Sequence, residues 1–198
     1  MKKWIVPIII IVVIAFWGFN VNNTAVDLQE GTKEAWADVQ SSYQRRNDLI
    51  GNLVKTVQGA ADFEKSTLEA VIKARSEASK PEINISDVGE LTPEKLAVFN
   101  KAQSGLSSAL SRLLVTVERY PDLKANQNFL ELQSQLEGTE NRINVARDRF
   151  NDAVRPYNSY VRKFPAKLIA GLIGFDEMGY YEAEDGAEKP VDVEFNFN

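Results

Sequence analysis

The sequence predicts an all-α protein in which an N-terminal transmembrane helix is followed by an antiparallel bundle of three to four long helices. An unbroken apolar run from Trp4 to Phe19 predicts the first helix. Apolar residues that recur at every seventh position in two long stretches predict the bundle. No proline interrupts the chain between Pro7 and Pro81, which favours long helices over short elements.

This pattern divides the chain into three parts. The expected boundaries are 1–22 for a membrane anchor, 23–175 for a helical bundle domain and 176–198 for an acidic C-terminal tail. The anchor run is slightly shorter than the roughly 20 residues that span a bilayer core, but the uncharged residues after it can occupy the interface. Aromatic residues near both ends fit the two interfaces. The residues that best define the anchor are Trp4, Pro7, Ile10, Trp17 and Phe19.

Two questions about this anchor stay open. A cleaved signal peptide would have an apolar region of about 7 to 15 residues followed by a small-x-small site, and Asn23-Thr24-Ala25 matches that site poorly. The lysines at positions 2 and 3 outnumber Lys33, the nearest base after the run. The positive-inside rule then predicts a single-pass protein of the cell (inner) membrane with a cytoplasmic N-terminus and an extracytoplasmic helical domain. The inverted topology is the alternative.

The first long helix of the bundle has a narrow apolar seam, which requires partner helices. Its seven-residue series consists of Trp36, Tyr43, Ile50 and Val57, and its interleaved positions are Val39, Leu53 and Ala60. Because no proline follows until Pro81, we expect this helix to continue from the membrane through Ala78, with Gly31, Gly51 and Gly59 as weak points. The polar stretch from Ser79 to Glu90 is expected to be a loop in which the chain reverses.

Two further long helices and one short helix are expected after this loop. Thr92 as N-cap and Pro93 at the first helical position begin the second helix, which Pro121 closes. The third helix has the cleanest periodicity, with the series Phe129, Leu136, Ile143, Phe150, Tyr157 and Phe164. A short apolar helix, 166–175, should cap the end of the bundle or dip into an interface, because it is too short to cross a bilayer. The tail after it is expected to be mostly flexible.

The motifs within these helices resemble the LemA family. The resemblance rests on Trp36, on RRNDLIGNLV (45–54), and on downstream stretches such as ALSRLLVTVERYPDLKA (109–125) and QLEGTENRINVARDRFNDAV (135–154). It implies a bacterial membrane-anchored helical protein of a family whose molecular function is not established. Gly51 stands where the family usually has Pro, and Phe63 stands where it usually has His.

Composition excludes several classes of chemistry. The sequence contains no Cys and no His, so thiolate nucleophiles, Cys/His zinc sites, Ser-His-Asp triads and Glu-x-x-His di-iron sites are absent. The formal net charge is −5 and no basic cluster is present, which argues against nucleic acid as a partner. We therefore expect no enzymatic activity, no cofactor and no metal site.

Two sets of polar residues remain as candidates for interaction. One set follows the face of the first helix opposite its seam and is a candidate interaction surface: Arg45, Asp48, Asn52, Lys55 and Gly59. The other set is expected to form a structural polar network that sets helix register: Arg46, Glu64, Glu118, Glu140, Arg147 and Asn151. A pocket that uses Arg46 and Arg147 to hold an anion is an alternative interpretation of the second set.

These observations, with the resemblance, predict a non-enzymatic, membrane-anchored structural or interaction protein of the bacterial envelope that self-associates as a scaffold. One alternative is an accessory or regulatory subunit of a membrane-bound protease or signalling complex. A second alternative is a ligand-binding or enzymatic helical bundle. A defined homo-oligomer would favour the first interpretation, and a small molecule that survives purification would favour the last.

Overall fold

The computed structural model describes residues 4–59, 63–80 and 91–182. All regular secondary structure in these ranges is helical, in agreement with the predicted all-α class. The helices are α1 (Ile5–Gln58), α2 (Lys65–Ala78), α3 (Pro93–Val117), α4 (Pro121–Lys124), α5 (Gln127–Arg162) and α6 (Ala166–Ile173).

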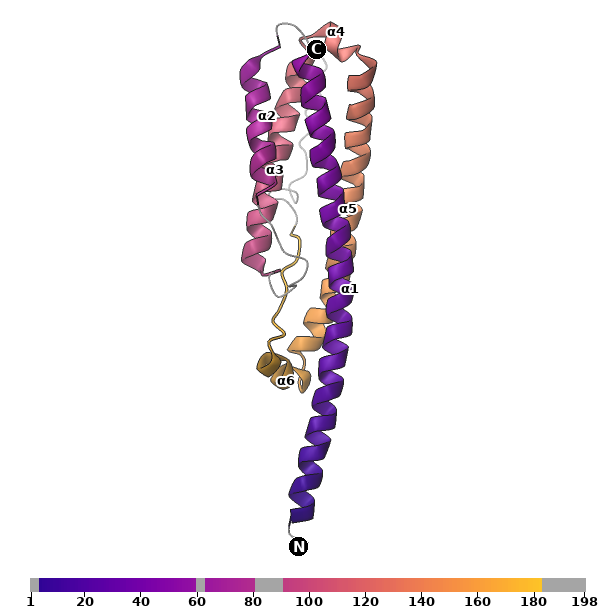
Figure 1. The fold of residues 1–198 in the computed structure, drawn as a ribbon, viewed down its shortest axis with the longest axis vertical. Coiled ribbons are helices and arrows are strands. Elements are labelled where there is room, and N and C mark those ends of the chain that lie inside the picture. The colour runs from indigo at the N-terminus through magenta and orange to yellow at the C-terminus, as the bar shows by residue number, and fades with distance from the viewer. Residues whose placement is uncertain (1–3, 60–62, 81–90, 183–198) are drawn as a thin grey trace, which may run out of the picture.

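The four longest helices alternate in direction and form an antiparallel bundle, as the sequence predicts (Figure 1). Helix α1 packs along α5, and α2 packs along α3. Helix α4 lies at the end of the bundle remote from the N-terminus, whereas α6 lies beside α1 toward the N-terminal end (Figure 1). The N-terminal part of α1 extends beyond the other helices.

The seam positions form the core of the bundle. Trp36 is 1% exposed, and its ring centroid lies 5.5 Å from that of Phe99 and 5.4 Å from that of Phe150. A second core cluster surrounds Ile50 and Leu53 nearer the α4 end. The heptad pattern therefore identified the buried faces of α1 and α5, because residues seven apart lie on one side of a helix.

The projecting part of α1 has the properties of a membrane span. Its most apolar window has a mean hydropathy of 2.3 and is almost entirely exposed. Of the predicted anchor residues, Trp4, Pro7, Ile10 and Phe19 are exposed and Trp17 is partly buried. Side chains this apolar are stable when exposed only if a lipid phase or another apolar surface covers them. Lys2 and Lys3, on which the expected topology depends, lie outside the described residues.

The expected continuous helix from the membrane through Ala78 is wrong. Helix α1 ends at Gln58, with Gly59 as its C-cap, and α2 begins at Lys65. The reversal allows α2 to bury Leu68 and Val71 against the bundle, which a straight continuation of α1 would leave uncovered. Position 60, the last expected seam residue, and the greater part of the expected 79–90 loop lie outside the described residues.

The prediction also differs from the structure near the C-terminus. Phe164, the last member of the seven-residue series, is 80% exposed because α5 ends at Arg162 and Pro165 follows. The tail was expected to be flexible from residue 176, but Met178 and Tyr181 are 2% and 6% exposed within the core. These two residues belong to the core cluster that also contains Trp36 of α1, Phe99 of α3 and Phe150 of α5. Residues 183–198 lie outside the described part of the chain.

Candidate functional site

The most connected polar cluster in the described part of the chain surrounds Arg46, which lies on the buried face of α1 and is 3% exposed. Its guanidinium donates hydrogen bonds to Gln103 Oε1 at 2.6 Å, to Glu140 Oε1 at 2.8 Å and to Ser107 Oγ at 3.1 Å. It also lies 4.9 Å from the ring centroid of Tyr43, one turn earlier. One side chain therefore connects α1 with α3 and α5.

Gln103 extends this cluster to the fourth bundle helix. Its Nε2 donates a hydrogen bond to the Ala78 carbonyl at the end of α2, at 3.0 Å. Gln103 is not among the residues predicted from the sequence, although it interrupts an apolar series that includes Phe99 and Leu106 on the buried face of α3. A polar residue at such a position is buried only with partners, and this is the signal that could have identified it.

A hollow of about 440 Å³ lies beside this cluster, between α1, α3 and α5. Its polar lining includes Arg46, Asn100, Glu140 and Arg147. Among the residues that the structure describes, Arg46 Nε and Asn100 Oδ1 are buried without a hydrogen-bond partner. Two cations and one carboxylate line the hollow, so its charge is suited to a small polar or anionic molecule.

Arg147 lines the hollow, but Arg147 and Asn151 contact the C-terminal segment and not the Arg46 side chain. The guanidinium of Arg147 lies 4.7 Å from the ring centroid of Tyr181. Asn151 Nδ2 donates to the Tyr181 carbonyl at 2.9 Å, and the Tyr181 N–H donates to Asn151 Oδ1 at 2.8 Å. Asn158, two turns further along α5, repeats this pairing with the backbone of Met178.

Where the segment packs against α5, Tyr157 of α5 and Tyr181 of the segment are both buried. The Tyr157 hydroxyl donates to the Asp176 carbonyl at 2.9 Å. Burial, reinforced by the charge of Asp176, raises the pKa of Tyr157 to about 12. Burial also raises the pKa of Tyr181 far above its ordinary value. Both phenols are therefore neutral at physiological pH, and their role in this region is packing and hydrogen bonding.

The last two residues of the expected network, Glu64 and Glu118, lie near the α4 end, apart from Arg46. Glu64 accepts hydrogen bonds from Ser66 and Arg119, which lower the pKa of its carboxyl group. Glu118 pairs with Lys124. Both carboxylates are exposed, and no three acidic side chains in residues 4–59, 63–80 and 91–182 are arranged to hold a metal ion.

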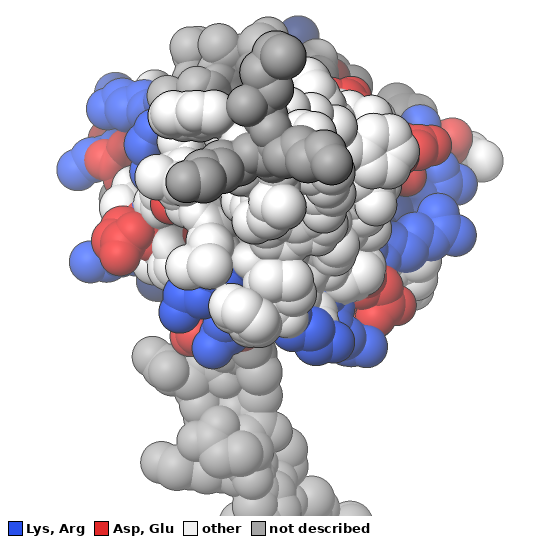
Figure 2. Space-filling model, turned by 90° about the horizontal axis from the view of Figure 1, so that it is seen from below, with Lys and Arg blue, Asp and Glu red and all other residues white. Residues whose placement is uncertain are grey.

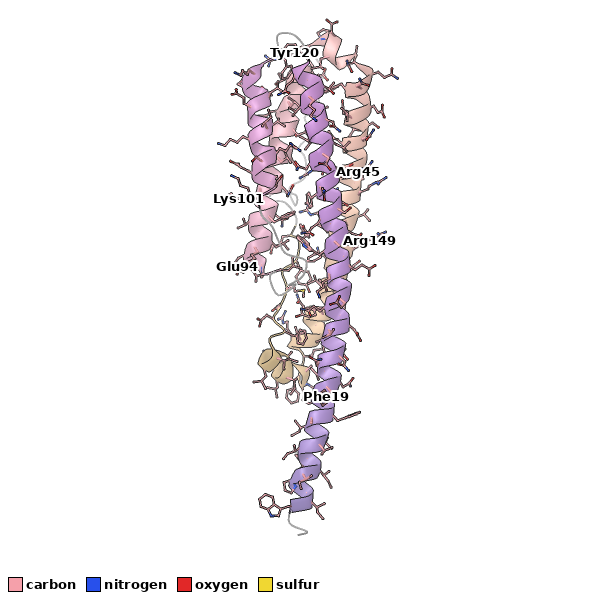
Figure 3. The ribbon with its side chains drawn as sticks, in the orientation of Figure 1. Phe19, Arg45, Glu94, Lys101, Tyr120 and Arg149 are labelled. Atoms are coloured by element: carbon pink, nitrogen blue, oxygen red, sulfur yellow. The ribbon has the colours of Figure 1, made fainter. Side chains whose placement is uncertain are left out.

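All five residues of the candidate interaction surface are exposed along the outer side of α1, which Arg45 marks in Figure 3. Gly51, by contrast, is covered from within the same chain. The guanidinium of Arg75 lies about 3.1 Å from the position of a Cβ at Gly51, and Arg75 Nε donates to the Asn47 carbonyl at 2.9 Å. The candidate interaction surface on α1 therefore borders the face of α1 that packs against α2.

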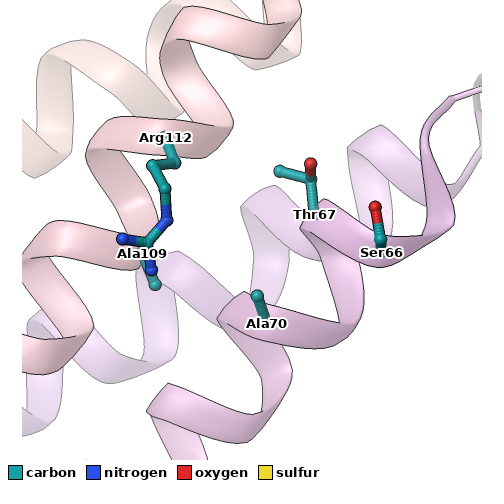
Figure 4. Close-up of a pocket in the computed structure, with 5 residues that line it drawn as sticks. All are labelled: Ser66, Thr67, Ala70, Ala109 and Arg112. Carbon is teal, nitrogen blue, oxygen red and sulfur yellow. The ribbon is translucent and has the colours of Figure 1, made fainter.

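A shallow depression of about 210 Å³ lies between α2 and α3 (Figure 4). It offers two hydroxyl groups, from Ser66 and Thr67, and one guanidinium, from Arg112. None of the residues predicted for a functional site lines it. The Arg46 cluster, in which predicted residues do meet, is therefore the stronger candidate site.

Fold and site together define a class: helical bundles carried on an apolar N-terminal helix, with a buried arginine that joins the bundle helices. The LemA family model matches residues 35–195, and the chain belongs to the LemA family. The match includes the Arg46 cluster, the Asn151 and Asn158 pairings and α6.

Relatives of this chain include magnetosome proteins. Magnetosome protein MamQ 2 of Paramagnetospirillum magneticum is 27% identical over 184 residues, which cover 85% of this chain and 67% of the relative. Magnetosome protein MamQ of Magnetospirillum gryphiswaldense is 26% identical, with the same coverage of each chain. Protein LemA of Metamycoplasma hominis is 24% identical over 165 residues, which cover 83% of this chain and 70% of the relative. These similarities support a membrane-associated protein.

Proposed function

We propose that this protein is a non-enzymatic, membrane-tethered interaction module of the bacterial envelope that self-associates through the outer surface of α1. The observation that carries the proposal is the continuity of α1. Its 54 residues, about 80 Å of helix, run from the apolar segment into the bundle core without a break. The bundle is thereby held at a fixed position relative to the membrane, which suits a scaffold.

The charge pattern on the outer surface of α1 supports self-association. Arg45, Asp48 and Lys55 alternate in sign along one exposed face. A second copy in the same membrane, related by a two-fold axis along the membrane normal so that the two α1 helices are parallel, can place the Arg45 side chain against Asp48 of its partner, and the reverse contact follows by symmetry. Such a contact is isologous and closed, so it gives a defined dimer without open-ended assembly.

The test is the molar mass of the full-length protein in mild detergent, measured by light scattering. We expect a defined oligomer, which the Asp48→Ala/Asn52→Ala variant should dissociate at concentrations at which the wild type stays assembled. The matched control is Lys101→Ala/Ser108→Ala, which removes two exposed polar side chains from α3, on another side of the bundle (Figure 3). An oligomer that survives Asp48→Ala/Asn52→Ala would exclude this surface as the interface.

A monomeric wild type would exclude the self-association proposal and favour the accessory-subunit alternative. In that case, crosslinking in native membranes should trap a second protein at the same surface.

For topology, we propose a cytoplasmic N-terminus with the bundle on the extracytoplasmic side of the inner membrane. Protease added to intact spheroplasts should then digest the bundle, whereas protection until lysis would indicate the inverted orientation.

A second candidate function is the binding of a small anionic or polar molecule in the hollow beside Arg46. Two of the buried polar atoms without partners, Arg46 Nε and Asn100 Oδ1, belong to residues that line the hollow, and they favour this function. Native mass spectrometry of the protein released from detergent would show a bound mass. That mass should be lost in Asn100→Leu but kept in Asn141→Leu, an exposed control on α5. A wild-type spectrum with the protein mass alone would exclude this function.

A further inference from the structure

Helix α6 exposes an apolar face that the bundle does not use. Leu168 and Leu172 are 60% and 82% exposed, and Phe164, just before the helix, is 80% exposed. Ala166 and Ala170, on the opposite side of the helix, are buried and form its contact with the bundle. Large apolar side chains that point outward together mark a surface that another apolar phase covers.

The position of α6 identifies that phase. Helix α6 packs against α1 just above Phe19, where the apolar segment ends (Figures 1 and 3). Val21 and Ala25, in the two turns of α1 that follow Phe19, are buried. Viewed from the N-terminal side, this end of the molecule is mostly uncharged, and its charged side chains gather at the rim (Figure 2). A bilayer that contains the anchor therefore lies against the exposed face of α6.

We propose that α6 is an interfacial membrane helix that inserts Phe164, Leu168 and Leu172 into the lipid surface around the anchor. The proposal rests on the membrane insertion of α1. With α1 in the bilayer, lipid is always within reach of α6, so no second protein is needed to cover it. The apolar face of such a helix lies at the boundary between headgroups and acyl chains.

The charges around α6 indicate what drives this contact. Lys163 and Lys167 are exposed, and Arg162 is paired with Glu177 at 2.9 Å. Asp176 adds one further exposed negative charge. Three basic and two acidic groups nearly balance, so apolar burial rather than attraction to anionic lipid is the main driving force. Insertion should therefore occur in zwitterionic lipid and change little with salt.

Because the sequence contains no cysteine, single labelling sites can be introduced without a background. The full-length variants Leu172→Cys, Ile10→Cys and Val115→Cys would be labelled with an environment-sensitive fluorophore and reconstituted into phosphatidylcholine vesicles. Position 10 reports the anchor, position 172 reports α6, and position 115 is a matched control. Val115 is 72% exposed and lies near the opposite end of the bundle, which Tyr120 marks in Figure 3.

We expect lipids with a quencher on the acyl chain to reduce the fluorescence at positions 10 and 172 severalfold more than at position 115. Aqueous iodide should show the reverse order. Iodide quenching at position 172 equal to that at 115, with position 10 still quenched by lipid, would overturn the α6 proposal and leave the anchor intact. Protection of position 172 from both quenchers would also overturn it, since protein would then cover α6. Absence of lipid quenching at position 10 would overturn the anchor itself, and α6 insertion with it.

Discussion

Arg46 has a charged side chain at a position where the periodicity of α1 calls for an apolar one. Its partners are unequally buried: Gln103 is 8% exposed, whereas the Glu140 side chain is 41% exposed. When Arg46 is removed, Glu140 can be solvated by water, but Gln103 Oε1 is left buried without its donor. The expected cost therefore comes from one unpaired amide and from lost packing, not from an isolated buried charge.

Arg46→Ala should thus lower the free energy of unfolding by about 1 to 3 kcal/mol, the usual cost of leaving a buried polar group unpaired. Chemical denaturation of the detergent-solubilised protein measures this change. Arg45→Ala, at the adjacent exposed position, is the control and should change stability by less than about 0.5 kcal/mol. Equal effects of the two substitutions would contradict the role assigned to the Arg46 hydrogen bonds.

The buried phenol of Tyr157 should make the stability of the folded protein depend on pH in the alkaline range. Its pKa is raised to about 12 in the folded state, because burial and the nearby Asp176 disfavour the phenolate, compared with about 10 for an unfolded tyrosine. The folded state therefore favours the neutral phenol. This stabilisation is fully present below about pH 10 and is lost as the pH rises toward about 12.

Tyr157→Phe should accordingly reduce the loss of stability between about pH 10 and pH 12, because the ionisable group is gone. In the folded protein it should also remove one late-ionising tyrosine from a titration followed by phenolate absorbance. Tyr180→Phe is the control, since Tyr180 is 40% exposed. An unchanged late phase in Tyr157→Phe would show that Tyr157 is not protected.

The segment that follows α6 packs so closely against the start of α3 that one of its positions has no room for a side chain. The Gly179 N–H donates to the Leu91 carbonyl at 2.9 Å, and a Cβ at Gly179 would lie 2.9 Å from Pro93 Cα. Backbone atoms cannot move aside as a flexible side chain can. Gly179→Ala should therefore destabilise the protein by about 1 to 3 kcal/mol.

The same substitution at Gly138 should have the opposite effect on stability. Gly138 lies inside α5, is exposed and has no atom within 4 Å of its Cβ position. Alanine there should stabilise the helix by about 0.5 to 1 kcal/mol, because glycine loses more backbone entropy on folding. Thermal unfolding of the two variants should therefore shift in opposite directions. A shift of the same sign for both would contradict the close contact at Gly179.

The buried faces of the helices were predictable from sequence, whereas the contacts between distant segments were not. Ile50 and Phe150 are fully buried, as the seven-residue spacing indicates, because this spacing follows from helix geometry alone. The reversal after Gly59 depends on what α2 buries against α3. Met178 and Tyr181 lie in a stretch without apolar periodicity, and two asparagines of α5 pair with their backbone. No local pattern encodes such a contact.

The Arg46 cluster was likewise only partly predictable from the sequence. Arg46 and Glu140, which the sequence places in one expected polar network, meet at 2.8 Å. Gln103, however, lies on the buried face of α3, where the sequence pattern marks only the apolar residues. The negative charges of Glu64 and Glu118 suit a pairing with Arg46, but charge alone carries no information about which end of a bundle a residue occupies.

The whole molecule couples a membrane span to a bundle through one uninterrupted helix. The bundle begins directly after the apolar run ends at Phe19, because Val21 and Ala25, in the next two turns of α1, are already buried. The turns of α1 immediately after the apolar run therefore belong to the packed bundle. Loss of these turns should weaken the bundle even when no membrane is present.

A chain that begins at Asn20 should therefore unfold at a higher temperature than one that begins at Asp27, although neither contains the anchor. Burying one valine side chain contributes about 1.5 to 3 kcal/mol, which corresponds to roughly 3 to 12 °C in melting temperature for a domain of this size. Within the longer chain, Val21→Ala should give part of this decrease, whereas Val26→Ala, at a position 36% exposed, should give much less. Equal melting temperatures for the two chains would place the start of the bundle beyond residue 26.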